Sequence, residues 1–289
     1  MKQNAPKYQL RKAHRINNNL SEPAAKVAGS ESVEGNMYRD NMRKITVALD
    51  GRMTPFKITD NVYFVGTYQA SVHLIDTGDG YILIDTGYEN TFDMVVDSLK
   101  ELKIDLSNIK YILNTHWHGD HTEASGMMAA LTGAKNVISR IDAYEVERLG
   151  YFKPDVLVDD GDVLRLGNTE IKLIHTPGHT KGTMSFTFET TVNGKKLVCG
   201  MHGGAGANSL VPSFATYYEG CREDYLASCE RLLGIHVEVF IGNHVWNNDT
   251  YEKYLEMQRT GKNPFVDSNE WVKFINHCMA RCNSLPPLD

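Results

Sequence analysis

The stretch Asn114–Thr122, NTHWHGDHT, dominates the interpretation of this sequence, because it places three histidines and one aspartate within six consecutive positions. The whole chain of 289 residues contains only 11 histidines. Imidazole and carboxylate side chains are common protein ligands of divalent transition metals. A chance cluster of surface or core histidines explains this density poorly, so the stretch predicts a metal site.

The local pattern also predicts how these side chains point. The first histidine directly follows the apolar run IKYILNT, which is typical of a β-strand, and loops at strand ends commonly carry functional residues. In an extended chain, His116 and His118 face the same side. Gly119 allows the backbone to turn sharply, which lets Asp120 and His121 face an adjacent point. We therefore expect two adjoining ligand groups, each of them incomplete.

Two later histidines, each at a predicted strand end, complete these groups. His179 follows the Pro-Gly turn in HTPGHTKG, and His244 ends the apolar run in FIGNHVW. The prediction is two Zn²⁺ ions per chain in two three-ligand groups: His116, His118 and His179, and Asp120, His121 and His244. Three protein ligands leave a coordination position open, as in catalytic rather than structural zinc sites. Iron or manganese remains an alternative, because the same ligand types bind both metals.

Charge and composition argue against several classes of partner. The formal net charge is -6 and no block of Lys and Arg stands out, so we expect no nucleic-acid partner. No apolar run approaches the roughly 20 residues of a membrane-spanning helix, so we expect no membrane partner. The five cysteines form no CxxC pair and the basic N-terminus lacks an apolar core, which together favour a cytoplasmic location.

The polarity and hydrophobic periodicity of the sequence change near residue 50. Residues 1–50 are polar and weakly periodic, so we expect an N-terminal extension that is either loose or packed on a neighbouring subunit of a homo-oligomer. In residues 51–289, short β-rich runs are followed by helical patterns, and this order occurs twice. Such an order predicts an α/β domain of the α+β type, in which two sheets pack face to face with helices outside.

Local signals predict two element boundaries. The segment TEASGMMAALTG has helical spacing, with Thr122 as the expected N-cap and Gly133 as the terminating residue. The dipeptide Asn193-Gly194 suits a type I′ turn, so it predicts a β-hairpin between the β-rich runs on either side of it.

These residues together carry a resemblance to the metallo-β-lactamase superfamily, whose mark is the HxHxDH pattern, present here as HWHGDH. The resemblance runs from about Pro55 to about Trp246 and includes ILIDTG, HTPGHTKG and GNH. It implies a four-layer αββα sandwich of two mixed sheets, the metallo-β-lactamase fold, with the metal site at one edge. Within the superfamily, the sequence looks most like the β-lactamase subclass with His-His-His and Asp-His-His dizinc sites.

The resemblance also implies roles for further residues. Asp85 would orient a ligand histidine, as carboxylates behind metal ligands do. Asp120 would be the catalytic residue, because it would ligate the second metal and orient the attacking hydroxide. His202 replaces a usual residue at the edge of the site, where it would contact substrate or support a ligand.

One segment departs from related hydrolases of the superfamily. Glyoxalase II and the acyl-homoserine lactonases usually have an aspartate that bridges both metals after the later strand. The corresponding segment here, LVCGMHGGAGANS, has Met201 after Gly200 and offers no carboxylate at that place. Cys199 is two positions too early to act as a thiolate ligand, and we expect it to face the core. The missing bridge argues against glyoxalase and lactonase activity.

The resemblance therefore implies a dizinc hydrolase that attacks a small-molecule substrate, a cyclic amide of the β-lactam type, with a metal-bound hydroxide. Hydrolysis of another small ester, lactone or thioester is the alternative, because the unmatched segment after Cys199 and the expected cytoplasmic location weaken an antibiotic substrate. A metal-binding scaffold without catalysis is less favoured. A nuclease is disfavoured by the negative net charge, and a flavo-diiron protein by His118, which stands where those proteins have Glu.

Overall fold

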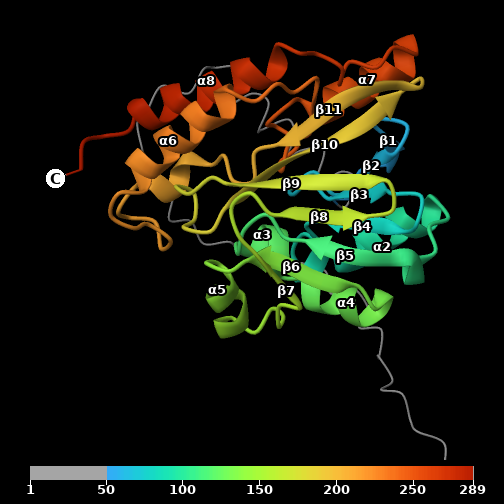
Figure 1. Ribbon diagram of the computed structural model, residues 1–289, viewed down its shortest axis with the longest axis horizontal. Helices are drawn as coiled ribbons and strands as arrows, with labels where there is room; N and C mark the ends of the chain where they lie inside the picture. Colours follow the sequence, from blue (N-terminus) through green and yellow to red (C-terminus); the bar gives the residue numbers. More distant parts are fainter. Residues whose placement is uncertain (1–50, 289) are drawn as a thin grey trace, which may run out of the picture. The chain divides into compact units, whose positions relative to one another are not determined.

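The computed structural model describes residues 51–288, and the expected N-terminal extension of residues 1–50 lies outside the described residues. In the described part, two β-sheets pack face to face and helices cover their outer faces (Figure 1). This four-layer αββα arrangement of two mixed sheets confirms the fold class expected from the sequence. No helix among residues 51–288 has the length and apolar character that a membrane span requires.

The first sheet has the spatial order β1-β2-β3-β4-β5-β6-β7. Its strands are β1 (Phe56–Lys57), β2 (Val62–Phe64), β3 (His73–Asp76), β4 (Tyr81–Ile84), β5 (Ile109–Leu113), β6 (Lys135–Ser139) and β7 (Val156–Val158). β1 to β4 pair antiparallel, whereas β4 to β7 pair parallel. Because parallel strands end at the same edge of a sheet, the loops after β4, β5 and β6 meet there, which is where α/β proteins commonly bind ligands.

The second sheet has the spatial order β12-β11-β10-β9-β8. Its strands are β8 (Val163–Leu166), β9 (Thr169–His175), β10 (Met184–Val192), β11 (Lys195–Met201) and β12 (Val239–Phe240). All neighbours pair antiparallel except β11 and β12, which pair parallel. Asn193 and Gly194 join β10 to β11 with φ of 52° and 75°. Positive φ at both positions is what a type I′ turn needs, so the predicted hairpin is confirmed.

The helices are α2 (Phe92–Glu101), α3 (Gly119–Thr122), α4 (Ser125–Thr132), α5 (Ala143–Arg148), α6 (Cys221–Leu233), α7 (Thr250–Thr260) and α8 (Glu270–Asn283), with short 3₁₀ turns η1 (Glu89–Thr91), η2 (Leu106–Asn108) and η3 (Ala207–Leu210). Gly133 ends α4 in the left-handed conformation, as predicted. The N-cap prediction for Thr122 is wrong, because the turn at Gly119 starts a helix earlier. Thr122 ends α3, and its hydroxyl donates to the Trp117 and His118 carbonyl oxygens.

Hydrophobic clusters fill the spaces between the layers. Successive side chains of a strand point to opposite faces, so a buried strand contributes side chains to a hydrophobic cluster on each face of the sheet. Ile82 and Ile84 of β4 enter the cluster between the sheets, whereas Leu83 packs with α2 on the outer face. On the other side, Leu173 of β9 faces the first sheet and Ile174 packs with α6 and α8. Each fully buried side chain of this kind contributes about 1.5–3 kcal/mol.

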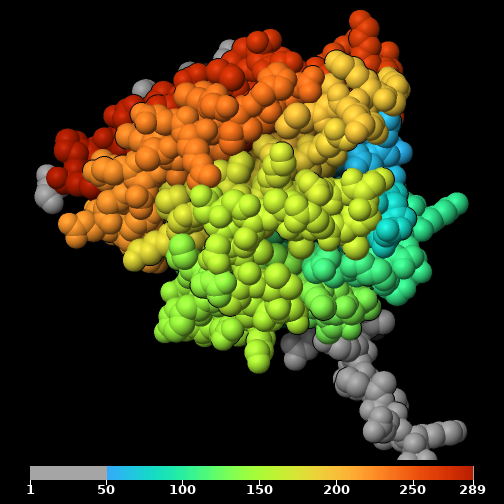
Figure 2. Space-filling view, viewed as in Figure 1, coloured from blue at the N-terminus to red at the C-terminus, as the bar shows by residue number. Residues whose placement is uncertain are grey.

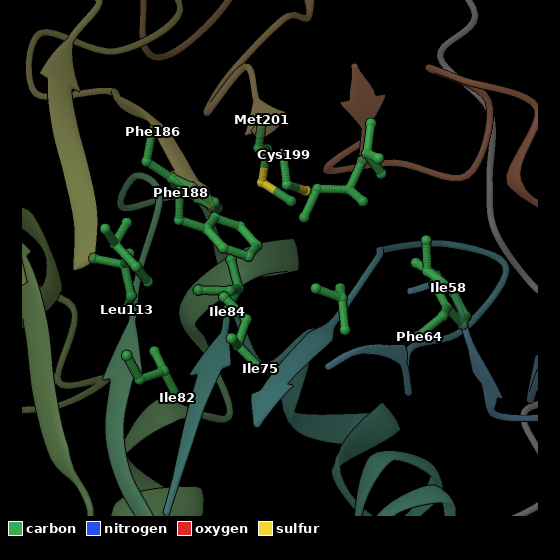
Figure 3. Close-up of a cluster of buried hydrophobic side chains, with 14 of the residues drawn as sticks. Ile58, Phe64, Ile75, Ile82, Ile84, Leu113, Phe186, Phe188, Cys199 and Met201 are labelled. Atoms are coloured by element: carbon green, nitrogen blue, oxygen red, sulfur yellow. The ribbon is translucent and has the colours of Figure 1, made fainter. Parts of the chain in front are cut away.

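The cluster between the sheets also contains Cys199 and Met201 of β11, close to Phe186 and Phe188 (Figure 3). Both sulfur-bearing side chains are buried among apolar groups. The expectation that Cys199 faces the core is confirmed, and the position after Gly200 is filled by an apolar side chain rather than by a metal ligand.

The two halves of the described chain build the two halves of the sandwich. The first sheet and α2 to α5 come from the earlier residues, and the second sheet and α6 to α8 come from the later ones. Figure 2 shows the same division on one face of the molecule, with the green segments below and the orange and red segments above. A site at the shared edge of the sheets therefore takes residues from both halves.

Candidate metal centre

Three loops at strand ends bring six metal-type side chains together at one edge of the sandwich. The first loop follows β5 and continues into α3, the second joins β9 to β10, and the third follows β12. The potential ligand atoms within each group lie within 4.8 Å of one another, and the two groups are His116, His118 and His179, and Asp120, His121 and His244. The structure thus assembles the same two sets that the sequence analysis paired.

The first group consists of three imidazole nitrogens that converge on one point. His118 Nδ1 lies 3.1 Å from His116 Nε2 and 3.0 Å from His179 Nε2. Two nitrogens bound to a tetrahedral zinc at about 2.0–2.1 Å lie ~3.3 Å apart. The observed spacing is close to this value, so the three nitrogens fit around a single ion.

The second group adjoins the first. Asp120 Oδ2 lies 3.4 Å from His121 Nε2 and 3.4 Å from His244 Nε2, a spacing that again suits ligands of one ion. The rings of His116 and His121 are 4.3 Å apart, which places the groups side by side. His121 Nε2 is buried and makes no hydrogen bond of regular geometry, so the Asp120 carboxylate is its partner only as an ion pair. The residues present therefore fit a pair of divalent cations.

The outward ring nitrogens define the tautomers. His179 Nδ1 donates to the carbonyl oxygen of Gly206 at 2.7 Å, and His244 Nδ1 donates to that of Gln69 at 2.9 Å. A carbonyl oxygen can only accept, so the proton lies on Nδ1 in both rings. The lone pair of Nε2 consequently faces the centre, which is the orientation that metal coordination needs.

Asp85 orients one histidine from each group. Its carboxylate accepts the His121 Nδ1–H at 2.8 Å, and the backbone N–H and hydroxyl of Thr115 at 2.8 and 2.9 Å. Because the Thr115 hydroxyl donates to Asp85, its oxygen is left to accept the Nδ1–H of His116 at 3.0 Å. These contacts are those that the role inferred for Asp85 requires, but they reach two ligand histidines rather than one.

Burial keeps the first group electrically neutral. Burial lowers the pKa of His118 to about 2 and that of His179 to about 4, and it holds the pKa of His116 well below its usual value. His244 of the second group has its pKa lowered to about 4 for the same reason. Neutral imidazole is the form that binds metal, so these rings need to lose no proton at neutral pH.

His121 behaves differently because two carboxylates flank it. Burial alone would lower its pKa, but Asp120 and Asp85 raise it to about 10. Burial also opposes ionisation of Asp120, yet the adjacent His121 holds the pKa of that carboxyl well below its usual range. Without metal, the second group is thus an ion pair, and a bound cation would take the place of the His121 proton.

His202 lies outside both groups. Its ring is buried 5.9 Å from that of Tyr225, and its Nδ1 accepts the backbone N–H of Gly204 at 3.2 Å. A Cβ atom at Gly204 would come within 2.7 Å of the His179 ring. His202 therefore touches the site through a glycine that packs directly against one of the proposed ligands.

Sequence reasoning missed the groups that hold the ligands from outside. Gln69 and Gly206 act through backbone carbonyl oxygens, which have no signature in the sequence. Ser209 adds a hydroxyl 2.9 Å from His179 Nδ1 and lies far along the chain from that histidine. Thr115 had a usable signal, because it is a hydroxyl residue directly before the first histidine of the motif.

Aromatic side chains lie beside the centre. Trp246 stacks on the ring of His244 at 4.3 Å and 8°, and it remains 39% exposed. The ring of Phe214 lies 6.5 Å from that of His118. A partly exposed indole and phenyl next to the ligands offer apolar surface to a small molecule bound there.

Comparisons with known proteins agree with this geometry. A family model described as the metallo-beta-lactamase superfamily matches residues 65–244, and the chain belongs to this superfamily. Among solved structures, BJP-1, a subclass B3 metallo-beta-lactamase of Bradyrhizobium japonicum, has a TM-score of 0.75 and 27% identity, covering 81% of this chain and 93% of that one.

Two curated relatives extend the comparison. The lactamase-like protein aptB of Emericella nidulans is 34% identical over 151 residues, or 52% of this chain and 43% of aptB. A hydroxyacylglutathione hydrolase of Methylococcus capsulatus is 30% identical over 128 residues, or 44% of each chain. The matches span less than half the length of these two relatives. These similarities agree with membership of the metallo-beta-lactamase superfamily.

Proposed function

We propose that this hydrolase opens a cyclic amide of the β-lactam type, with two zinc ions bound by the groups His116, His118 and His179, and Asp120, His121 and His244. One observation carries the proposal: two three-ligand groups lie side by side, and Met201 is buried in the core where related hydrolases place a bridging aspartate. The resemblance to a subclass B3 metallo-beta-lactamase supports the same choice.

The protein groups have separable roles in this proposal. When bound, two zinc ions would acidify a water molecule and polarise the substrate carbonyl. The Asp120 carboxylate, 23% exposed and facing both histidines of its group, would orient that water by accepting a hydrogen bond from it. Asp85 and Thr115 keep two ligand rings in the metal-binding tautomer. Trp246 offers apolar surface for the part of the substrate that does not react.

The test combines metal analysis with a chromogenic cephalosporin. We expect about two zinc ions per chain, loss of turnover after chelation, and recovery when zinc is added back. His116→Ala should abolish turnover, whereas His236→Ala, at an exposed histidine near Glu238, should not. Normal metal loading without cephalosporin turnover would refute β-lactam hydrolysis. Iron or manganese in place of zinc in the purified protein would show that the proposed metal is wrong.

Hydrolysis of a small thioester, ester or lactone is the second candidate. Similarity to a hydroxyacylglutathione hydrolase favours it, although that match covers 44% of each chain. Parallel assays with a glutathione thioester, an aryl ester and a lactone would separate the candidates. A thioester kcat/KM far above the cephalosporin value, lost in His116→Ala, would replace the first candidate by the second.

We also propose that residues 51–289 form the hydrolase domain and that residues 1–50 are an extension able to mediate homo-oligomer formation. The described residues 51–288 contain both ligand groups and the clusters that connect the layers, which supports this boundary. Light scattering on the full chain and on residues 51–289 tests it. The same number of subunits in the two proteins would rule out an oligomer built through the extension.

We propose a reducing compartment, such as the cytoplasm, for this protein. The five cysteines are buried and free of disulfides, which supports this location. Thiol titration of the denatured protein, isolated from its own cells under alkylating conditions, should find five free thiols. Fewer thiols would contradict the proposed location.

A further inference from the structure

Asp142 is a buried carboxylate that the proposed chemistry does not use. It lies directly before α5 and is 2% exposed. Its Oδ2 accepts the backbone N–H of Trp117 at 3.2 Å and the hydroxyl of Thr180 at 2.7 Å. Its Oδ1 accepts the backbone N–H of Gly182 at 2.8 Å. Three donors therefore converge on one side chain.

The three donors belong to the two loops that supply the His-His-His group. Trp117 stands between His116 and His118, in the loop that follows β5 of the first sheet. Thr180 directly follows His179, in the loop between β9 and β10 of the second sheet. One carboxylate thus links a loop of one sheet to a loop of the other, next to the ligands that must converge.

The packing around Asp142 leaves little freedom. A Cβ atom at Gly182 would come within 2.5 Å of Asp142 Oδ1 and 2.3 Å of the Ser139 hydroxyl oxygen. The backbone N–H of Asp142 itself donates to that hydroxyl at 3.1 Å. Hydrogen bonds to a carboxylate are directional, so three of them can hold two loops in a fixed relation.

We propose that Asp142 is a positioning residue that sets the distance between the His116–His118 loop and the His179 loop, and thereby the metal affinity of the His-His-His group. The inference rests on the proposed assignment of this group as a metal site. Asp85 reaches both groups through His121 and Thr115, whereas the contacts of Asp142 at Trp117 and Thr180 directly adjoin ligands of the first group only. Its loss should therefore weaken one metal site and spare the other.

The experiment compares Asp142→Asn with the wild-type chain by zinc titration against a chromophoric chelator. An amide has the shape of the carboxylate but carries its own N–H donors, so at least one of the three donors would face another donor. We expect one zinc site to weaken by about 10-fold to 100-fold, the range seen when groups behind metal ligands are replaced. The other site should stay within threefold of wild type.

Visible absorption of the Co²⁺-substituted protein provides a readout that a loss of stability alone would not move, because the spectrum reports coordination geometry. The bands of one site should shift in Asp142→Asn, and those of the other should persist. The matched control is Asp155→Asn, since Asp155 also accepts a backbone N–H, that of Asn136 at 2.8 Å, but contacts neither ligand loop. This control should retain both wild-type affinities and the wild-type spectrum.

The outcomes separate this inference from the proposed function. Two zinc affinities in Asp142→Asn within threefold of wild type would overturn the inference while leaving the hydrolase proposal intact. Selective loss of one site in a protein that turns over no substrate would support the inference and refute the activity. A wild-type chain that binds no metal would overturn both.

A second variant keeps the test decisive if Asp142→Asn fails to fold. Thr180→Val removes one donor and preserves the size of the side chain, so it should weaken the same zinc site by a smaller factor. Unchanged affinity of both sites in this variant would also overturn the inference.

Discussion

Asp85→Asn is the substitution whose effect on metal binding follows most directly from the contacts. Asp85 adopts φ of 57°, a left-handed conformation that Asn also tolerates, so the backbone should not change. The amide has one accepting oxygen in place of two. Placed at the Oδ2 position, this oxygen keeps His121 and the Thr115 hydroxyl, but the amide N–H₂ then faces the Thr115 backbone N–H.

The opposite amide orientation is equally unfavourable. It sets the N–H₂ group against the Nδ1–H of His121, and relief comes only if the ring moves its proton to Nε2, the atom that faces the metal centre. A hydrogen bond to a charged group contributes about 1.5–3 kcal/mol. At 1.36 kcal/mol per tenfold change, its loss corresponds to an affinity decrease of roughly 10-fold to 100-fold. Because Thr115 also holds His116, both sites should weaken.

Zinc titration against a chromophoric chelator at pH 7.5 measures both affinities. Asp76→Asn is the control, because the Asp76 carboxylate accepts the Gly78 backbone N–H in an exposed turn and lies behind no ligand. If Asp85→Asn keeps both affinities within threefold of wild type, the outward hydrogen bonds do not orient the ligands, and the reasoning is refuted. Weakening of one site only would contradict the link through Thr115.

Three further substitutions test other parts of the structure. Burial lowers the pKa of His73 to about 3. Between pH 6.5 and that value, the unfolded chain therefore binds a proton at His73 that the folded chain does not. The contribution of His73 to the free energy of unfolding is complete above pH 6.5 and falls by about 1.36 kcal/mol per pH unit below it. In urea unfolding of the metal-free protein, His73→Phe should therefore gain roughly 2–3 kcal/mol relative to wild type between pH 7.5 and pH 4.5, and parallel pH profiles would contradict this. Gly204→Ala places a methyl group within 2.7 Å of the His179 ring, so one zinc site should weaken by about tenfold in a chelator competition assay. Wild-type affinity would show that the loop moves to accommodate the methyl group without disturbing His179. Ile84→Ala removes a fully buried side chain between the sheets and should lower the free energy of unfolding by about 2–5 kcal/mol, whereas a loss below 1 kcal/mol would mean that the sheets close the cavity.

The sequence predicts the six side chains of the centre because motif, spacing and strand ends all point to the same place. The order of β-rich runs and helical patterns was sufficient to predict the layers, and the apolar run of β4 packs on both faces, with Ile82 and Ile84 in one cluster and Leu83 in another. The helix start at Thr122 was predicted wrongly because Ser/Thr propensity says nothing of a turn that begins three residues earlier at Gly119.

The groups behind the ligands were harder to predict for a different reason. Asp142 lies 25 residues after Trp117 and 38 before Thr180, and neither separation has a helical or strand period that would indicate contact. Gln69 lies 175 residues from His244 and acts through its backbone. Such pairs become neighbours only when the sheets pack together, so no local sequence pattern indicates the contact.

Because the early residues provide four of the six ligand side chains and the later residues provide His179 and His244, neither half of the chain can assemble a complete site alone. The exposed turn from Asp159 to Asp162 joins the halves between β7 and β8. Two polypeptides separated at this turn would carry complementary fragments of one coordination sphere. Bound metal would then add to the hydrophobic contacts between the two fragments, and a chelator would weaken their association.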